Sequence, residues 1–181
     1  MIITISGKPG SGKTTIAKVL AEKLGYKHLS MGDLRGKIAM THGLTIDELN
    51  EIGKKESWTD LEADEELIKI GKSNEDYVID TWLGYHLLPD SIKIFLDIGE
   101  EDGAKRVFTN QRSDEEKKDS VEGVKKMLKK RVQNTRERFL KYYKTDFLDL
   151  SKYNLVIDTS DLNIQQVLNK VLDYLKKRGI K

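Results

Sequence analysis

The clearest chemical signal in the sequence is a glycine-rich segment close to its first residue. It reads Gly7, Lys8, Pro9, Gly10, Ser11, Gly12, Lys13 and Thr14, and it matches the pattern G-x-x-x-x-G-K-[ST]. Glycines allow successive backbone N–H groups to converge on an oxyanion, and a following helix adds the positive end of its dipole. We therefore expect the segment from Gly7 to Thr15 to hold the phosphates of ATP. Lys13 would bridge the β- and γ-phosphates, and the Thr14 hydroxyl would hold Mg²⁺.

Such a loop works together with a carboxylate near the metal ion. Two apolar segments of strand character end at an aspartate: residues 77–79 are followed by Asp80, and residues 92–96 by Asp97. We favour Asp80 as the metal carboxylate and keep Asp97 as the competing candidate. Either aspartate could instead only cap the turn after its strand, which is a common position for this residue.

The phosphate loop needs a strand before it and a helix after it, and the sequence contains both. Residues 2–5 are β-branched and mostly apolar, as in a strand buried on both faces. From Thr14 onward, apolar residues recur at helical spacing as far as Gly25, which suits the left-handed end of a helix. Asp33 is expected to cap the next helix.

Strands alternate with helices along the rest of the chain. Further strands are expected at 26–29, 77–79, 92–96 and 155–158, and helices at 34–40, 45–52, 60–70, 101–110, 121–142 and 164–175. Parallel neighbours need crossover connections, so this order predicts a doubly wound α/β protein with a five-stranded parallel sheet and helices on both faces. The segment 111–120 contains no apolar residue and is expected to be a mobile loop.

Composition limits the partners of the chain. Its 181 residues fit a single domain over 1–181, and 32 Lys and Arg against 30 Asp and Glu leave a formal net charge of +2. So small a charge argues against nucleic acid or an anionic membrane as a partner. The lack of cysteine rules out disulfides and thiolate metal ligands, and His28, His42 and His86 do not have metal-ligand spacing. No apolar run has the length of a membrane span, and the cytoplasm is the expected location.

Nearly the whole chain resembles the nucleoside monophosphate kinases, above all the archaeal cytidylate kinases, which are relatives of adenylate kinase. The resemblance rests on the phosphate loop and on the segments 29–33, 60–64, 78–84, 131–146 and 153–160. It implies a P-loop NTPase fold with a helical monophosphate-binding insertion at about 34–72 and a small lid at about 111–120. Closure of such a lid keeps water away from the phosphoryl group during its transfer.

The resemblance also implies cations around the transferred phosphoryl group, which makes the arginines informative. Only seven residues are arginine. Arg131 and Arg138 lie about 20° apart around a helix, whereas Arg136 points roughly 140° away. Planar guanidinium groups can donate two parallel hydrogen bonds to phosphate, so we assign Arg131 and Arg138 to the catalytic clamp, although a pair with a nearby glutamate is the ordinary role of a helix arginine. Arg112 and Arg106 are further candidates for contact with ATP.

For the acceptor monophosphate, the resemblance points to Ser30, Asp80 and an arginine of the following helix. Family members place this arginine four residues after a glycine, whereas Arg35 lies only three after it and Gly36 has the usual position. A rotation of about 100° on the helix could still direct Arg35 to the phosphate, and Lys37 is a substitute.

The base of the acceptor stays open at this point. The exocyclic amine of cytosine would need a hydrogen-bond acceptor, for which Asp60, Asp64 or a backbone carbonyl are candidates. Trp58 or Trp82 could stack on the base, or both could be ordinary, partly buried aromatic residues.

The resemblance thus predicts an enzyme that transfers the γ-phosphoryl group of ATP to CMP or dCMP, giving ADP and CDP or dCDP. Lys13, Arg131 and Arg138 would be its catalytic cations, Thr14 and Asp80 would hold Mg²⁺, and no prosthetic group is expected. An adenylate kinase-type enzyme with AMP as acceptor is one alternative. A second, of another class, is an ATPase that acts as an RNA or ribosome assembly factor. The enzyme would act in nucleotide metabolism as a monomer or homodimer.

Overall fold

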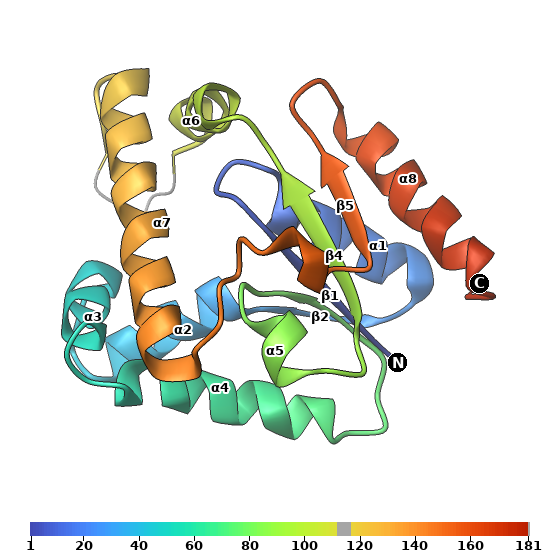
Figure 1. Ribbon diagram of the computed structural model, residues 1–181, viewed down its shortest axis with the longest axis horizontal. Coiled ribbons are helices and arrows are strands. Elements are labelled where there is room, and N and C mark those ends of the chain that lie inside the picture. Colours follow the sequence, from blue (N-terminus) through green and yellow to red (C-terminus); the bar gives the residue numbers. More distant parts are fainter. Residues whose placement is uncertain (112–116, 181) are drawn as a thin grey trace.

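The computed structural model describes residues 1–111 and 117–180, in which five strands form a parallel sheet (Figure 1). The strands are β1 (Ile2–Gly7), β2 (Lys27–Ser30), β3 (Tyr77–Asp80), β4 (Ile92–Asp97) and β5 (Leu155–Asp158). They lie in the order β2-β3-β1-β4-β5, and each neighbouring pair is parallel. The α/β architecture expected from the alternation of strands and helices is confirmed.

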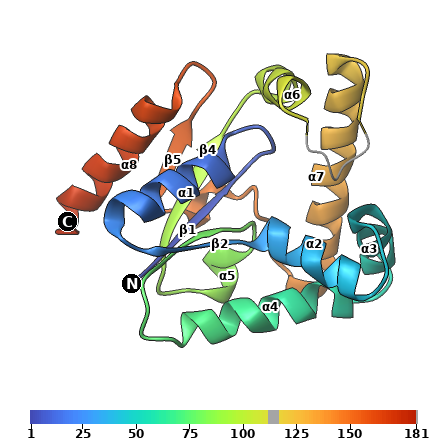
Figure 2. The same ribbon diagram turned by 180° about the vertical axis from the view of Figure 1, so that it is seen from behind.

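Helices lie on both faces of the sheet. They are α1 (Lys13–Leu24), α2 (Met31–Thr41), α3 (Ile46–Gly53), α4 (Trp58–Gly71), α5 (Gly84–Leu87), α6 (Glu100–Thr109), α7 (Val121–Tyr143) and α8 (Ile164–Lys177), with a short 3₁₀ turn at Leu150–Lys152. Helices α1 and α8 cover one face, and α5 lies against the other (Figures 1 and 2). Helices α2, α3 and α4 pack on one another beside α7.

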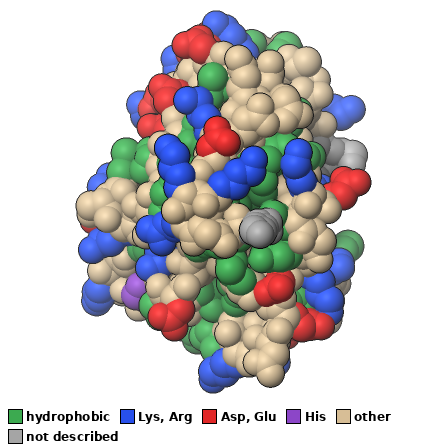
Figure 3. Space-filling view, turned by 90° about the vertical axis from the view of Figure 1, so that its right-hand side faces the viewer, with side chains coloured by type: hydrophobic (Ala, Val, Ile, Leu, Met, Phe, Trp, Pro, Cys, Tyr) green, Lys and Arg blue, Asp and Glu red, His purple; other side chains and the backbone are tan. Residues whose placement is uncertain are grey.

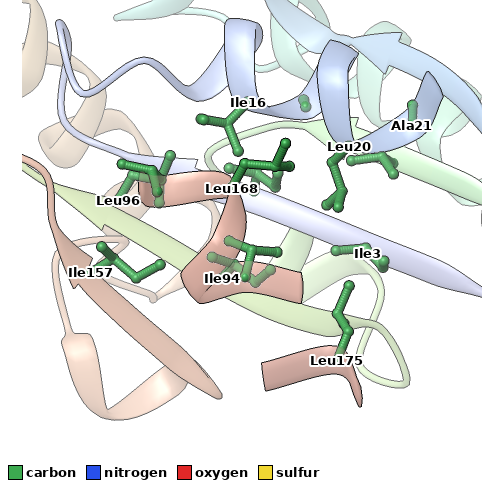
Figure 4. Packing of buried hydrophobic residues seen from close by; sticks show 14 residues of the cluster. Ile3, Ile16, Leu20, Ala21, Ile94, Leu96, Ile157, Leu168 and Leu175 are labelled. Carbon is green, nitrogen blue, oxygen red and sulfur yellow. The ribbon is translucent and has the colours of Figure 1, made fainter. Parts of the chain in front are cut away.

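The main hydrophobic core joins the sheet to α1 and α8. Ile3, Ile94 and Ile157 of three strands lie in one buried cluster with Leu20 of α1 and Leu168 of α8 (Figure 4). Burial of each such side chain contributes roughly 1.5–3 kcal/mol to folding. The core therefore holds the C-terminal ends of the strands and the N-terminus of α1 in a fixed relation.

A second cluster fixes the helices beside the sheet. Leu49 of α3 and Leu67 of α4 are fully buried, Ile38 of α2 belongs to the same buried cluster, and Ile79 connects them to β3. Helices α2 to α4 are thus attached to the strand that ends at Asp80, so their polar side chains can face the same space as the phosphate loop.

Two local expectations are corrected. Helix α2 begins at Met31, directly after β2, and its N-cap is Ser30, whose Oγ accepts a hydrogen bond from the backbone N–H of Asp33 at 3.3 Å. Asp33 lies in the first turn and is not the cap, because the extended backbone at Ser30 already brings a hydroxyl to the helix end. The short helix α5 was not expected, since four residues are too few for a periodic signal.

The surface carries charges of both signs. On the side of the molecule where α8 lies, Lys and Arg side chains are interspersed with Asp and Glu (Figure 3). None of the helices in the described part of the chain combines the length and apolar character needed to cross a bilayer.

Candidate active site

The phosphate loop lies between the end of β1 and the start of α1, as its motif requires. Gly10 and Gly12 have positive φ angles of 82° and 87°, which side-chain-bearing residues rarely adopt. Helix α1 begins at Lys13, and no side chain caps its N-terminus. The backbone N–H groups of its first turn are therefore free to bind an anion.

Close packing leaves no room for side chains at two of the loop glycines. A Cβ added to Gly7 would lie 2.1 Å from the carbonyl oxygen of Leu96 in β4. A Cβ on Gly10 would lie 2.5 Å from the carbonyl oxygen of Gly103 in α6, and one on Gly103 would lie 2.8 Å from that of Pro9. Helix α6 thus supports the tip of the loop through direct backbone contact.

Lys13 is held at the base of the loop. Its Nζ donates a hydrogen bond to the carbonyl oxygen of Lys8 at 3.1 Å and lies 5.7 Å from the centre of the Trp82 ring. Burial lowers its pKa to about 8, against an opposing effect of Asp80, while Arg131 lowers it further. A buried ammonium group that uses only part of its hydrogen-bonding capacity within the protein is well suited to bind phosphate.

The structure places Asp80, not Asp97, beside Thr14. The Thr14 hydroxyl donates a hydrogen bond to Oδ2 of Asp80, because β3 is the neighbour of β1 and Asp80 pairs with Ile5 in the register. Asp97 ends β4 and instead forms an ion pair of 2.7 Å with Lys8. The hydroxyl and carboxylate that a Mg²⁺ site would use are therefore adjacent at Thr14 and Asp80.

One cavity of about 280 Å³ joins the phosphate loop to α2, α3, α4 and α7. It is lined by nine of the residues proposed from the sequence for phosphate binding, metal binding or catalysis: Pro9, Gly10, Lys13, Thr14, Ser30, Arg35, Asp80, Arg131 and Arg138. Of the other loop residues, Lys8 lines a neighbouring cavity, Thr15 is exposed, and the Ser11 side chain is buried. Arg112 lies outside the described residues, as does 112–116 of the expected lid.

The two arginines that the sequence analysis assigns to the clamp come from one face of α7. Arg131 and Arg138 both line the cavity, whereas Arg136 is directed elsewhere and pairs with Asp146 at 2.6 Å. Arg106 does not line the cavity. Its Nη2 donates to the carbonyl oxygens of Thr159 and Ser160 at 2.6 and 3.0 Å, so it anchors the segment after β5.

Asp60 joins two cavity arginines in a buried network. Its Oδ2 accepts from Nε of Arg138 at 2.7 Å, and its Oδ1 accepts from Nη1 of Arg35 at 2.5 Å. Asp60 and Arg138 are only 4% and 5% exposed. Asn50 Oδ1 completes the surroundings of Arg35, accepting from Nη2 at 3.1 Å. The Arg35 guanidinium thus reaches the cavity despite its shifted position in the sequence.

Asp64 lies one helical turn after Asp60 and also lines the cavity. It is 7% exposed, and its Oδ2 accepts a hydrogen bond from the Tyr143 hydroxyl. Burial raises the pKa of Asp64 to about 6, with Asp60 acting in the same direction, while the Tyr143 hydrogen bond and two arginines oppose it.

The two tryptophans have different surroundings. Trp82 lines the cavity, donates from Nε1 to the carbonyl oxygen of Gly7 at 2.8 Å, and stacks on Phe147 with ring centres 5.0 Å apart. Trp58 packs near His42 and does not line the cavity. Sequence reasoning missed the anchoring contact of Trp82 on the loop, because no local pattern signals a hydrogen bond between segments 75 residues apart. Asn50, Tyr143 and Gly103 were missed for the same reason.

Comparison of the sequence with known proteins identifies the family of this chain and several of its relatives. Residues 2–161 match the profile of a family described as "Cytidylate kinase-like family". The cytidylate kinase of Sulfolobus acidocaldarius is 34% identical over 183 residues, which cover 99% of this chain and 97% of that protein. A protein of Lacinutrix mariniflava named S-adenosylmethionine-dependent nucleotide dehydratase is 35% identical over 176 residues, which cover 97% of this chain but 36% of that protein. The chain therefore spans about a third of the length of this second relative.

Solved structures share the fold. The shikimate kinase of Bacteroides thetaiotaomicron aligns with a TM-score of 0.67 over 97% of this chain and 98% of its own, at 14% identity. Identity this low shows the fold alone, which is that of P-loop kinases.

Proposed function

Because this chain belongs to the cytidylate kinase-like family, we propose that it is a nucleoside monophosphate kinase that transfers the γ-phosphoryl group of ATP to CMP or dCMP. The observation that carries this proposal is that Lys13 of the phosphate loop and Arg35 and Arg138 of the neighbouring helices line the same cavity. The phosphate loop supplies a site for the donor, and helices α2 to α4 supply a second site for an acceptor. The likeness to part of a named nucleotide dehydratase agrees with a nucleotide as substrate.

Catalysis in such a site is positioning and charge neutralisation. An oxygen of the acceptor phosphate attacks the γ-phosphorus of ATP, the bond to the β–γ bridging oxygen breaks, and ADP leaves. Lys13 stabilises the negative charge on the β- and γ-phosphates, and Arg131 and Arg138 approach the phosphoryl group from α7. Arg138 is directed by its hydrogen bonds to Asp60.

Asp80 at the end of β3 and Thr14 in the first turn of α1 fit a magnesium ion bound with ATP. Thr14 and Asp80 bring a hydroxyl and a carboxylate together, which are the hard oxygen ligands that Mg²⁺ prefers. When bound, the ion would neutralise phosphate charge. No three His, Asp or Glu side chains gather into a metal cage within the described ranges, so phosphate oxygens would complete the coordination.

The acceptor phosphate is assigned to Ser30, Arg35 and Asp80, which line the cavity on the side of α2. Helices α2 to α4 correspond to the monophosphate-binding insertion, and the segment 111–120 to the lid, within a single domain over 1–181. We place the enzyme in the cytoplasm as a monomer or homodimer with nucleotides as its partners. The mixed charges in Figure 3 do not favour a nucleic-acid partner on that face.

An acceptor panel tests the proposal. ADP formation from ATP and Mg²⁺ is measured with CMP, dCMP, UMP, AMP, GMP and dTMP singly, and without acceptor. We expect strong stimulation by CMP or dCMP. Stimulation by AMP instead would identify an adenylate kinase-type enzyme, and slow ADP formation that is equal with and without acceptors would replace the kinase by an ATPase.

Gly103 is predicted to position the phosphate loop for ATP. In Gly103→Ala, the new Cβ would meet the Pro9 carbonyl oxygen at 2.8 Å and displace the loop tip. We expect kcat/KM for ATP to fall by about 10- to 100-fold. Alanine favours a helix over glycine, so loss of helix stability would not explain the result.

A matched variant separates this contact from a general effect of alanine. Gly123→Ala in α7 places its Cβ near only the Ser120 and Lys118 side chains, and its kinetics should stay close to those of the unchanged enzyme. Equal kinetics of Gly103→Ala and the unchanged enzyme would contradict the positioning role.

A further inference from the structure

The first peptide group of the phosphate loop is held from two sides. This group joins Gly7, the last residue of β1, to Lys8. Its N–H, on Lys8, donates to the carbonyl oxygen of Leu96 in β4 at 3.2 Å. Its carbonyl oxygen, on Gly7, accepts from Nε1 of Trp82 at 2.8 Å. Both polar atoms of the group therefore have partners, and the loop leaves the sheet in one fixed orientation.

The ring of Trp82 also contacts the cation of the loop. The Nζ atom of Lys13 lies over this ring, 5.7 Å from its centre, and donates to the carbonyl oxygen of Lys8 at 3.1 Å. A long lysine side chain that is ordered only when a ligand binds weakens the affinity for that ligand. The attraction between the ammonium group and the aromatic face orders Lys13 before ATP arrives.

Trp82 is itself fixed by a cluster of aromatic side chains. Its ring stacks on Phe147, which is fully buried, with the ring centres 5.0 Å and the planes 19° apart. Phe147 meets Phe139 of α7 edge to face, with ring centres 5.9 Å apart. The indole cannot leave the loop without disturbing this packing. The core of the protein therefore sets the position of the Trp82 ring, and the ring in turn contacts the loop.

We propose that Trp82 is a positioning residue of the donor site: its N–H fixes the orientation of the phosphate loop, and its ring orders Lys13 for the phosphates of ATP. The inference rests on the nucleoside monophosphate kinase function proposed above, in which ATP is the donor. Because Trp82 acts through Gly7 and Lys13, its loss should weaken the binding of ATP and leave the binding of the acceptor nearly unchanged.

Two variants of Trp82 separate the two contacts. Trp82→Phe removes the N–H and keeps an aromatic face, whereas Trp82→Leu removes both. Calorimetry gives the Kd of ATP with Mg²⁺ in the absence of an acceptor, and the Kd of CMP in the absence of ATP. We expect the Kd of ATP to rise about 2- to 10-fold in Trp82→Phe and about 10- to 100-fold in Trp82→Leu. The Kd of CMP should stay within about twofold in both variants.

Two control variants exclude a general loss of stability as the cause. Trp58→Phe makes the same exchange at a tryptophan that packs near His42 and does not line the cavity, so the Kd of ATP should stay within about twofold. Leu87 of α5 packs against the same cluster as Trp82. Leu87→Ala should lower the melting temperature without raising the Kd of ATP. A purely structural role of Trp82 predicts weaker ATP binding in Leu87→Ala as well.

A double-mutant cycle tests whether the ring acts through Lys13. With Lys13 present, the Kd of ATP should be at least about threefold higher in Trp82→Leu than in Trp82→Phe. In the Lys13→Ala background, the same two variants should differ by less than about twofold, because the ring has no ammonium group to order. An equal difference in both backgrounds would contradict the role of the ring.

Fluorescence tests the contact without a change at Trp82. The chain has two tryptophans, so Trp82 is the only one left in Trp58→Phe. The emission of an indole depends on nearby charges, and ATP should therefore change the emission of this variant. An emission that ATP leaves unchanged would contradict the contact between the ring and the lysine that binds phosphate.

Three binding results would overturn the inference. The first is an unchanged Kd of ATP in Trp82→Leu. The second is tighter binding of ATP in this variant, which would mean that the ring competes with the phosphates for Lys13. The third is a larger loss for CMP than for ATP, which would place the ring against the acceptor. If ATP binding responds as expected while no acceptor supports turnover, the kinase proposal fails and the role of Trp82 stands.

Discussion

Lys13→Ala is expected to lower kcat for phosphoryl transfer by about two to three orders of magnitude. Lys13 lies at the start of α1 and lines the cavity together with Arg131 and Arg138, and alanine removes the cation that the phosphate loop itself supplies. The measurement is the rate of ADP formation with saturating ATP and acceptor. Lys18→Ala removes an exposed lysine from the same helix and should keep kcat within about twofold, since surface substitutions have small effects.

The pH dependence of ATP binding gives a second check on Lys13. Burial lowers its pKa to about 8. The protonated form binds phosphate, so the Kd for ATP should rise as the pH increases through 8, by up to about tenfold for each unit. Lys13→Ala should lack this dependence. If its kcat stayed within tenfold of the unchanged value, or if the pH dependence persisted, Lys13 would not be the cation that faces the phosphates.

Asp60→Ala is expected to destabilise the fold by about 3–5 kcal/mol, because two arginines lose their buried partner. Arg138 has a side-chain exposure of 4% and cannot reach water without a shift of α7. For a domain of this size the melting temperature should fall by roughly 6–20 °C. Activity should also fall, because Arg35 and Arg138 both line the cavity and both take their orientation from Asp60. Urea unfolding and the kinase assay measure the two effects.

An exposed ion pair of the same region is the control for Asp60. Glu51 pairs with Lys54 on α3 at 2.6 Å, and the Glu51 side chain is 60% exposed. Glu51→Ala should cost less than about 1 kcal/mol, because solvent screens such pairs. A similarly small cost for Asp60→Ala would mean that α2, α4 and α7 rearrange around the arginines, and that the network does not hold them.

The sequence left open which of several candidate residues lie near one another, and the structure shows their contacts. Asp80 and Asp97 both end strands, yet only β3 and β1 are arranged so that a carboxylate meets Thr14. Asp60 and Asp64 both suit a base, yet Asp60 is occupied by arginines. Strand order and helix packing depend on contacts between residues far apart in the chain, which spacing within one segment does not report.

Arg35 and Trp82 make the same point for side chains. The spacing of Arg35 departs from the resembling family, and its contact with Asp60 depends on how α2 packs on α4. Trp82 was one of two candidates for stacking on the base; its indole donates a hydrogen bond to the carbonyl oxygen of Gly7, and it lines the cavity. Neither contact follows from the local sequence. Each joins two elements that are far apart in the chain, and the packing of the hydrophobic clusters determines how close these elements lie.

The sequence by itself determined the phosphate loop, the alternation of strands and helices, and the shared helix face of Arg131 and Arg138. These features depend on residue types and on spacing within about ten residues, where backbone geometry is nearly constant. Tertiary structure alone decided which aspartate faces Thr14, which carboxylate pairs with the cavity arginines, and which glycine supports the loop from outside. Those outcomes depend on long-range packing, in which a whole cluster of buried side chains sets the distance between two segments.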